Sequence, residues 1–185
     1  MAYRGQLKTK KDKQMKGYIQ IYTGNGKGKT TAAIGLSIRA VGAGEKVFFA
    51  QFVKGQAYSE VKAIQHFLPA ITIKQYGLDC FIYNAPKQAD IEIARNGFDE
   101  ISQIISSGKY DIVVLDEANI AIYYKLFTVE ELIKVLKTKP EQTEIIIIGR
   151  NAKPELIEFA NLVTEMHEIK HYYTKGVDAR IGIEY

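Results

Sequence analysis

The sequence predicts a single α/β domain built around a mostly parallel β-sheet. Segments with a strand pattern alternate with segments that have a helix pattern, which is the order found in such domains. Two of the expected strands are apolar on both faces, as strands are when helices cover both sides of a parallel sheet. With 185 residues, the chain is long enough for one such domain and hardly long enough for two.

The first half of the chain is expected to hold three strands and three helices. Each strand is a short run of β-branched and aromatic residues. The first two helices are expected to end before Gly42 and Pro69, and the third repeats apolar residues at spacings of three and four. The expected strands cover 18–23, 46–53 and 71–76, and the expected helices cover 30–41, 58–68 and 89–105.

The second half continues the alternation. Thr128 and Glu131 have the spacing of a capping box, which predicts a helix over 128–137. Pro154 suits the first turn of a second helix, over 154–162. The expected strands are 111–116 and 144–149, followed by two closing strands over 163–169 and 180–184; residues 170–176 are expected to form a surface loop.

Composition excludes several classes of protein. The one cysteine, Cys80, cannot form an intramolecular disulfide and does not suit a cysteine-based zinc site. The longest purely aliphatic run, 145–148, is far too short to span a bilayer, and no signal peptide is visible. We therefore expect a cytoplasmic protein with no membrane association.

Positive charge is concentrated at the N-terminus. The formal net charge is +4, but residues 1–16 contain six basic residues and one acidic residue, so the rest of the chain is close to neutral. Such a tail is either a solvated leader or a segment that contacts a polyanion. We divide the chain into this tail, 1–16, and one domain over 17–185.

The strongest motif is a glycine-rich loop between the first expected strand and the first expected helix. Glycines let backbone N–H groups surround a polyphosphate, and the helix N-terminus adds its positive end. Lys29 is placed to reach phosphate oxygens, and the Thr30 hydroxyl is placed to bind Mg²⁺. The predicted ATP-binding residues are Gly24, Asn25, Gly26, Lys27, Gly28, Lys29, Thr30 and Thr31.

This loop departs from the usual phosphate-loop pattern. Its first glycine, Gly24, lies one residue late, because Thr23 occupies the usual glycine position relative to Gly28-Lys29-Thr30. One alternative is a glycine-rich turn without a ligand. The shifted glycine also suggests that a nucleotide does not lie here as it does in ordinary ATPases.

A hydrophobic strand that ends in two acids supplies the second half of a nucleotide site. Asp116 and Glu117 would lie at the carboxyl edge of the sheet, where a carboxylate can hold Mg²⁺ directly or through water. Either residue fits as the direct ligand. A hydrolytic enzyme would use such a glutamate as the base for water, and the spacing does not exclude that reading.

Six motifs in order resemble the P-loop type of ATP:corrinoid adenosyltransferase, over nearly everything after Lys16. The shortened phosphate loop and the GVDARIGIEY ending are the most specific of them. The motifs are TGNGKGKTTAAIG (23–35), RAVGAGEKV (39–47), QFVKG (51–55), VVLDEANIA (113–121), GRNAKPEL (149–156) and ANLVTEMHEIKHYYTKGVDARIGIEY (160–185).

The resemblance implies a RecA-like P-loop fold and a specific reaction. The family transfers the 5′-deoxyadenosyl group of ATP to the Co(I) centre of a reduced corrinoid and releases triphosphate, to make adenosylcobalamin or its precursor. It binds ATP in reverse relative to ordinary P-loop enzymes. No protein nucleophile is needed, because Co(I) is itself a strong nucleophile. The protein has to align cobalt with ribose C5′ and stabilise charge on the triphosphate.

The resemblance also assigns residues. Lys29 becomes the main charge on the triphosphate, Thr30 and Glu117 hold Mg²⁺ or Mn²⁺ with Asp116 in support, and Arg39 lies near the nucleoside. By spacing alone, Arg39 would belong to a solvated helix face.

Further expectations concern the corrinoid and the partners. The family has a Phe-x-Trp pair that helps to remove the lower ligand of the corrinoid; the nearest match here is Phe81 and Tyr83, in a chain without tryptophan. Family members are homodimers that receive electrons from a reductase, and their N-terminal segment can fold over the nucleotide, as 1–16 would here.

Two other functions remain as alternatives. The first is a P-loop ATPase that uses Glu117 to activate water. The second is a polyanion-binding module that uses the tail and the phosphate loop, although we expect no nucleic acid as partner.

Overall fold

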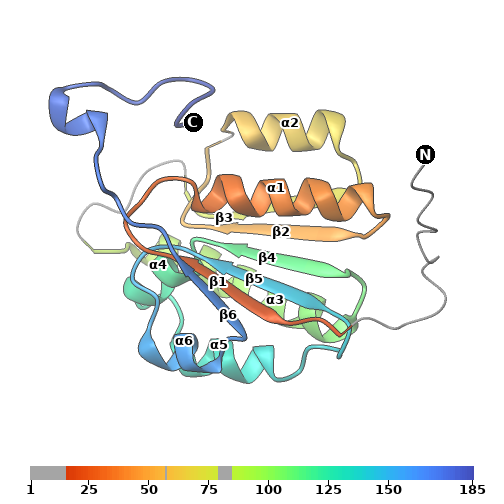
Figure 1. Ribbon diagram of the computed structural model, residues 1–185. Coiled ribbons are helices and arrows are strands. Elements are labelled where there is room, and N and C mark those ends of the chain that lie inside the picture. Colours follow the sequence, from red (N-terminus) through yellow and green to blue (C-terminus); the bar gives the residue numbers. More distant parts are fainter. Residues whose placement is uncertain (1–15, 57, 79–84) are drawn as a thin grey trace, which may run out of the picture.

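Six strands form one sheet in the order β3-β2-β4-β5-β1-β6. This computed structural model describes residues 16–56, 58–78 and 85–185. All of the strand pairings are parallel, which confirms the predicted fold class (Figure 1). The strands are β1 (Ile19–Thr23), β2 (Val47–Phe52), β3 (Ile71–Tyr76), β4 (Ile112–Asp116), β5 (Glu144–Ile148) and β6 (Leu162–Glu165).

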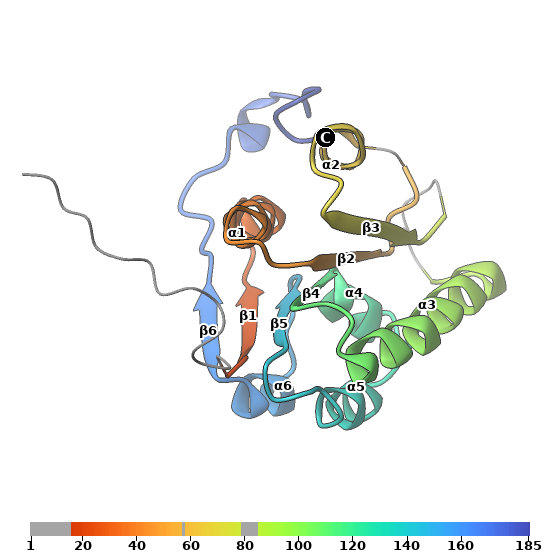
Figure 2. The same cartoon turned by 90° about the vertical axis from the view of Figure 1, so that its right-hand side faces the viewer.

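Helices cover both faces of the sheet. Viewed along the strands, α1 and α2 lie on one face and α3 to α6 on the other (Figure 2). Within the described residues, no helix has the length and apolar character needed to cross a membrane. The helices are α1 (Lys29–Gly42), α2 (Ser59–Phe67), α3 (Gln88–Ser107), α4 (Ala118–Tyr123), α5 (Val129–Leu136) and α6 (Pro154–Phe159), and a 3₁₀ helix, η1 (Tyr172–Lys175), follows.

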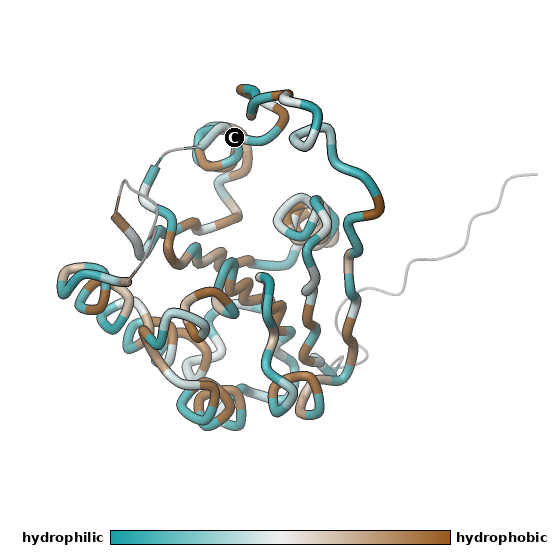
Figure 3. Tube along the Cα trace, turned by 90° about the vertical axis from the view of Figure 1, so that its left-hand side faces the viewer, coloured by the Kyte–Doolittle hydropathy of each residue, from teal (hydrophilic) through white to brown (hydrophobic). Residues whose placement is uncertain are grey.

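Each face of the sheet has its own hydrophobic core, because side chains alternate along every strand. In β2, Phe48 and Phe52 point to the larger core under α3, α5 and α6, whereas Phe49 points to the smaller core under α1 and α2. Figure 3 shows hydrophobic residues along the strands of the sheet. The central strands β2, β4 and β5 are therefore buried almost throughout, as their apolar runs predict.

The predicted capping box at the start of α5 is confirmed. The Thr128 hydroxyl accepts a bond from the Glu131 N–H at 3.2 Å, and the Glu131 carboxylate accepts one from the Thr128 N–H at 2.7 Å. Two backbone donors that the first helical turn leaves unpaired are thereby satisfied.

The sequence-based assignment is wrong in the last quarter of the chain. The segment 180–184 forms turns rather than a strand, because Gly182 has a φ of +75° and the Glu184 carboxylate accepts the Arg180 N–H. Helix α6 ends at Phe159, three residues early, so β6 begins at Leu162 and ends at Glu165. Helix α4 was not predicted.

After β6 the chain leaves the sheet and passes over α1 toward α2. We call this segment, residues 166–185, the C-terminal strap. Figures 1 and 2 both show it on the α1 and α2 side of the molecule, with the chain end beside α2. The predicted surface loop over 170–176 lies in this strap and contains η1.

A close approach between α3 and β3 gives a stability prediction. A Cβ atom on Gly97 would lie 2.5 Å from Cγ and Cδ1 of the Tyr76 ring, which packs in the core. We expect Gly97→Ala to lower the free energy of unfolding by about 1–3 kcal/mol, because the ring and helix must move apart. Urea unfolding followed by circular dichroism measures this.

Gly35→Ala in α1 is the matched control. No atom lies within 4 Å of a Cβ built on Gly35, so alanine should raise stability by up to about 1 kcal/mol through its higher helix propensity. Equal stabilisation by both substitutions would contradict the close approach at Gly97.

Candidate nucleotide site

Four parallel strands, β1, β2, β4 and β5, end at one edge of the sheet, and a cleft of about 520 Å³ opens there. Ligands of open parallel α/β sheets bind at this edge. The phosphate loop follows β1, and a charged side chain that lines the cleft follows each of the other three strands: Lys54 after β2, Glu117 after β4 and Arg150 after β5.

The phosphate loop depends on glycines at three positions. Gly24 and Gly28 have φ values of +91° and +111°, which side chains with a Cβ rarely adopt. Gly26 packs against the first residues of the C-terminal strap, and its N–H donates to the Met166 carbonyl at 2.6 Å. Since α1 begins at Lys29, the loop delivers that lysine to the first turn of the helix.

Lys29 is buried within its own loop. Its ammonium donates to the carbonyl oxygens of Gly24, at 2.8 Å, and of Gly26, at 2.6 Å. Burial lowers the pKa of Lys29, while the Glu117 and Asp116 carboxylates oppose that shift. The charge is thus held within the loop by neutral acceptors, and an anion in the cleft would compete well for it.

Asp116 is fully buried at the end of β4 and accepts three hydrogen bonds. Its Oδ1 accepts the Thr30 hydroxyl at 3.0 Å, and its Oδ2 accepts Gln51 Nε2 at 3.0 Å and the Lys54 ammonium at 2.9 Å. Burial disfavours the Lys54 charge, but the Asp116 and Glu117 carboxylates outweigh it and raise the pKa of Lys54. Asp116 therefore orients Thr30 and neutralises Lys54.

Glu117 has the opposite environment. It adopts a φ of +58°, and its Oε2 is buried without a hydrogen-bond partner among the described residues. Burial, and then the neighbouring Asp116 charge, raise the pKa of Glu117 to about 6. Gly149 leaves room for this carboxylate, since a Cβ there would lie 3.2 Å from Oε2. Glu117 thus brings to the cleft a buried carboxylate oxygen with free hydrogen-bonding capacity.

The raised pKa gives a pH prediction for the protein without nucleotide or metal. The folded state keeps a proton on Glu117 up to about pH 6, whereas the unfolded state releases it near pH 4.3. The free energy of unfolding should therefore fall by about 2 kcal/mol between pH 4 and pH 7 through this group. Glu117→Gln should lack this fall, and so should be the more stable protein at pH 7.

Urea unfolding of both proteins at pH 4.5 and 7.0 measures this difference. Equal pH dependence in the two proteins would mean that Glu117 is not perturbed by its surroundings.

The structure brings together most of the residues that the sequence singles out. Residues 25–31 and Glu117 line the cleft, and Asp116 lies directly behind Thr30. Arg39 does not line it: it is exposed on the last turn of α1, and its assignment to the nucleoside stays a prediction. Phe81, Tyr83 and residues 1–15 lie outside the described residues.

Sequence reasoning missed Lys54 and Arg150 as residues of the site. Both follow the carboxyl end of a parallel strand within two residues, as Glu117 does. That position was the available signal, because the carboxyl ends of neighbouring parallel strands meet at one edge. The strap residues 182–185 also line the cleft; they belong to the GVDARIGIEY ending that carried the family resemblance, but the sequence did not indicate their place in the site.

The parallel sheet, the loop between β1 and α1, and the acids at the end of β4 together define a P-loop nucleotide-binding protein. Comparison with known proteins narrows this class. The family model described as ATP:corrinoid adenosyltransferase BtuR/CobO/CobP matches residues 15–185, and the chain belongs to this family.

Curated relatives agree with the family model. The chain is 37% identical to a corrinoid adenosyltransferase of Sinorhizobium sp over 97% of its length and 84% of the relative. It is 34% identical to the corrinoid adenosyltransferase of Escherichia coli K12, over 92% of this chain and 86% of the relative. It is 33% identical to the corrinoid adenosyltransferase CobA of Salmonella typhimurium, over 92% of this chain and 86% of the relative.

The family resemblance and the enzymatic activity predicted from the sequence are thereby confirmed. The protein is a corrinoid adenosyltransferase, with ATP and a corrinoid as its substrates.

Proposed function

We propose that the cleft at the carboxyl edge of the sheet binds ATP, with its triphosphate in the loop 24–31 and Lys29 as the main compensating charge. The observation that carries this is the position of the Lys29 ammonium, which lies in the loop on two carbonyl oxygens within 2.8 Å. A triphosphate is a far stronger acceptor than these carbonyls, so Lys29 would exchange them for phosphate oxygens. Arg150, which follows β5 and also lines the cleft, supplies a further cation.

We propose that Thr30 and Glu117 hold Mg²⁺ or Mn²⁺, with Asp116 in support. The donor set fits a hard divalent cation: a hydroxyl and a carboxylate, with phosphate oxygens and water to complete the shell. The unpartnered Oε2 of Glu117 supports this fit. Asp116 already accepts three bonds, so its part is to hold the Thr30 hydroxyl in place. When bound, the cation neutralises charge on the triphosphate.

The reaction that we propose needs no protein nucleophile. The Co(I) electron pair forms a bond to ribose C5′, and the bond between C5′ and the phosphate oxygen breaks, with the electron pair leaving on triphosphate. The negative charge on the leaving group grows within reach of Lys29 and Arg150, which lower the barrier electrostatically. Reversed binding of ATP in the shortened loop would present C5′, rather than the γ-phosphorus, to the corrinoid.

Other parts of the proposal concern residues outside the cleft. We propose that Phe81 and Tyr83 contact the corrinoid, that Arg39 approaches the nucleoside and that residues 1–16 cover the nucleotide. A homodimer is supported by β6, which pairs with β1 alone among the described strands and leaves Leu162 and Val163 partly exposed. A partner reductase would supply Co(I). Light scattering tests the dimer.

An anaerobic assay with ATP, Mg²⁺ and chemically reduced cobalamin tests the reaction. We expect a light-sensitive alkylcobalamin and an equal amount of inorganic triphosphate. Orthophosphate without any product that contains a cobalt–carbon bond would instead support hydrolysis, with Glu117 as the base for water.

A further inference from the structure

The C-terminal strap is attached to the phosphate loop at both of its ends. Its first residue, Met166, accepts the Gly26 N–H at 2.6 Å. Near its other end, Ile183 and Glu184 contact the side chain of Lys27, the residue between Gly26 and Gly28. Residues that are 18 positions apart are therefore fixed to two neighbouring positions of one loop.

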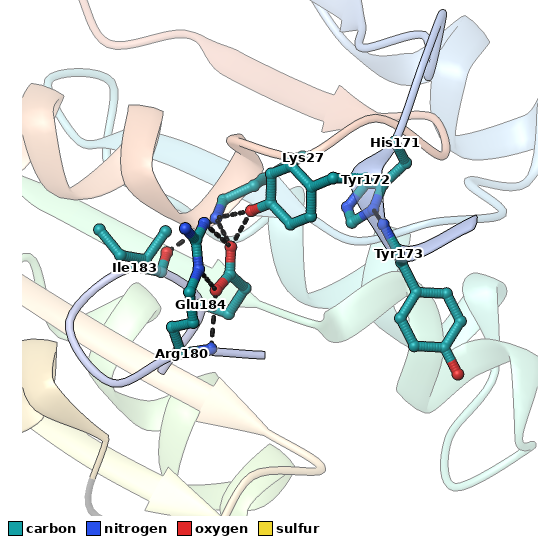
Figure 4. Close-up of polar contacts among 7 residues, drawn as sticks. All are labelled: Lys27, His171, Tyr172, Tyr173, Arg180, Ile183 and Glu184. Atoms are coloured by element: carbon teal, nitrogen blue, oxygen red, sulfur yellow. Dashed lines mark hydrogen bonds and ion pairs between the residues drawn. The ribbon is translucent and has the colours of Figure 1, made fainter. Parts of the chain in front are cut away.

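The Lys27 ammonium is engaged with the strap. It donates to the Ile183 carbonyl and to Glu184 Oε1, both at 2.8 Å, and the Tyr172 hydroxyl lies 3.5 Å away (Figure 4). These acceptors satisfy the three donors of an ammonium group. Within the part of the chain that the structure describes, the Lys29 ammonium by contrast donates hydrogen bonds only to carbonyl oxygens of its own loop. The two lysines of the loop thus have different partners and serve different purposes.

Glu184 is the centre of the contacts in Figure 4. Besides Lys27, its carboxylate accepts the Tyr172 hydroxyl and the Arg180 N–H, and the Arg180 guanidinium lies 3.4 Å from it. The Arg180 guanidinium also lies over the Tyr172 ring, 4.9 Å from its centroid. Hydrogen bonds, first from Lys27 and then from Tyr172, hold the pKa of the Glu184 carboxyl well below its usual range. Glu184 therefore organises the strap as well as tying it to the loop.

The tied end of the strap forms one wall of the cleft. Residues 182–185 line it together with the phosphate loop. The wall is anchored across the cleft as well, since the Ser59 hydroxyl donates to the Tyr185 carbonyl at 3.1 Å. The Tyr58 and Tyr185 rings lie 6.4 Å apart at the same place. Lys27 and Ser59 are thus the two points that hold this wall in position.

We propose that Lys27 and Glu184 form a clasp that closes the C-terminal strap over the nucleotide, and that Lys27 is a positioning residue rather than a phosphate ligand. The clasp shapes the wall before ATP arrives, so less order has to be created on binding. This proposal rests on the placement of ATP in the cleft. It assigns the two loop lysines to separate tasks: Lys29 compensates the triphosphate, and Lys27 holds the strap.

A double-mutant cycle tests the clasp, with Lys27→Met, Glu184→Gln and the double variant. Hydrogen exchange of the peptide 172–185 is measured without ATP, and the dissociation constant and KM for ATP are measured with Mg²⁺. We expect each single variant to exchange faster and to weaken ATP binding about three- to fivefold, with no further loss in the double variant. The loss should fall on the KM for ATP more than on kcat. Lys134→Met, on the exposed face of α5, controls for loss of one positive charge.

Other results would overturn the proposal. If Lys27 bound phosphate, Lys27→Met would weaken ATP binding more than tenfold, whereas Glu184→Gln would tighten ATP binding by removing an anion that competes for Lys27. The clasp would also be excluded if the losses of ATP affinity in the two single variants added up in the double variant. Unchanged hydrogen exchange of the peptide 172–185 in the variants would exclude it as well. Lys29→Ala separates the clasp from the proposed ATP site. Unchanged ATP affinity in that variant would reject the ATP site. The hydrogen-exchange data are collected without ATP, so they would still decide whether the clasp exists.

Discussion

Replacing Lys29 with alanine is expected to lower kcat/KM for adenosyl transfer by about 10²- to 10³-fold. The ammonium lies within the phosphate loop, where the proposed site has it compensate charge on the departing triphosphate. Three other cations, Lys27, Lys54 and Arg150, line the cleft, but they do not replace it. Lys54 is paired with Asp116 at 2.9 Å, and Lys27 is paired with Glu184 at 2.8 Å. Arg150 follows β5 and does not belong to the phosphate loop.

Anaerobic transfer kinetics, followed by the light-sensitive product, measure this loss. The Lys29→Ala protein should remain folded, because burial disfavours the lysine charge in the apo state and alanine suits a first helical turn. Lys153→Ala, at an exposed position before α6, removes an equal charge and should leave kinetics unchanged. Near-normal turnover of Lys29→Ala would contradict the assigned triphosphate site.

Replacing Asp116 with alanine is expected to lower the free energy of unfolding by about 3–5 kcal/mol. The substitution removes a fully buried carboxylate and leaves Lys54 and the Gln51 amide without their acceptor. The Thr30 hydroxyl also loses the bond that orients it. Urea unfolding measures the stability, and the same preparation should show no measurable transfer.

A second variant separates two contributions to this loss of stability: the unpaired charge that is left on Lys54 and the lost packing of the Asp116 side chain. In the Asp116→Ala/Lys54→Ala double variant no uncompensated cation remains, so its loss should be smaller than the sum of the single losses by at least about 1 kcal/mol. Simple additivity would mean that the Asp116 and Lys54 pair, although 2.9 Å apart, does not act as a unit.

The sequence predicts those parts of the fold that local pattern determines. The buried strands β2, β4 and β5 are continuous apolar runs, and α5 begins with its own capping box. Each of these elements can therefore be recognised from fewer than ten residues of sequence. The alternating residues Ile181 and Ile183 predict a strand equally well. That prediction is wrong because Gly182 turns the chain and Glu184 pairs with Lys27, more than 150 residues earlier.

The candidate site shows the same division. The phosphate loop and the acids at 116 and 117 are visible in the sequence, since the glycines, the lysine and the strand end lie close together. The different environments of the two acids are not visible. Asp116 accepts bonds from Thr30, Gln51 and Lys54, whereas one buried oxygen of Glu117 has no partner among the described residues. Only the three-dimensional arrangement of β1, β2 and β4 decides this difference.

The position of β1 in the sheet has a consequence for biosynthesis. Among the described strands β1 is the first to be made, yet it lies between β5 and β6, and Ile19 pairs with Ile145. The strand that carries the phosphate loop therefore cannot pair with its neighbours in the sheet until most of the chain has emerged from the ribosome. In the meantime, β2, β3 and β4 can already assemble. An incomplete chain would contain the entire glycine-rich motif without a sheet to hold it. We expect nucleotide binding to begin only when synthesis is nearly finished.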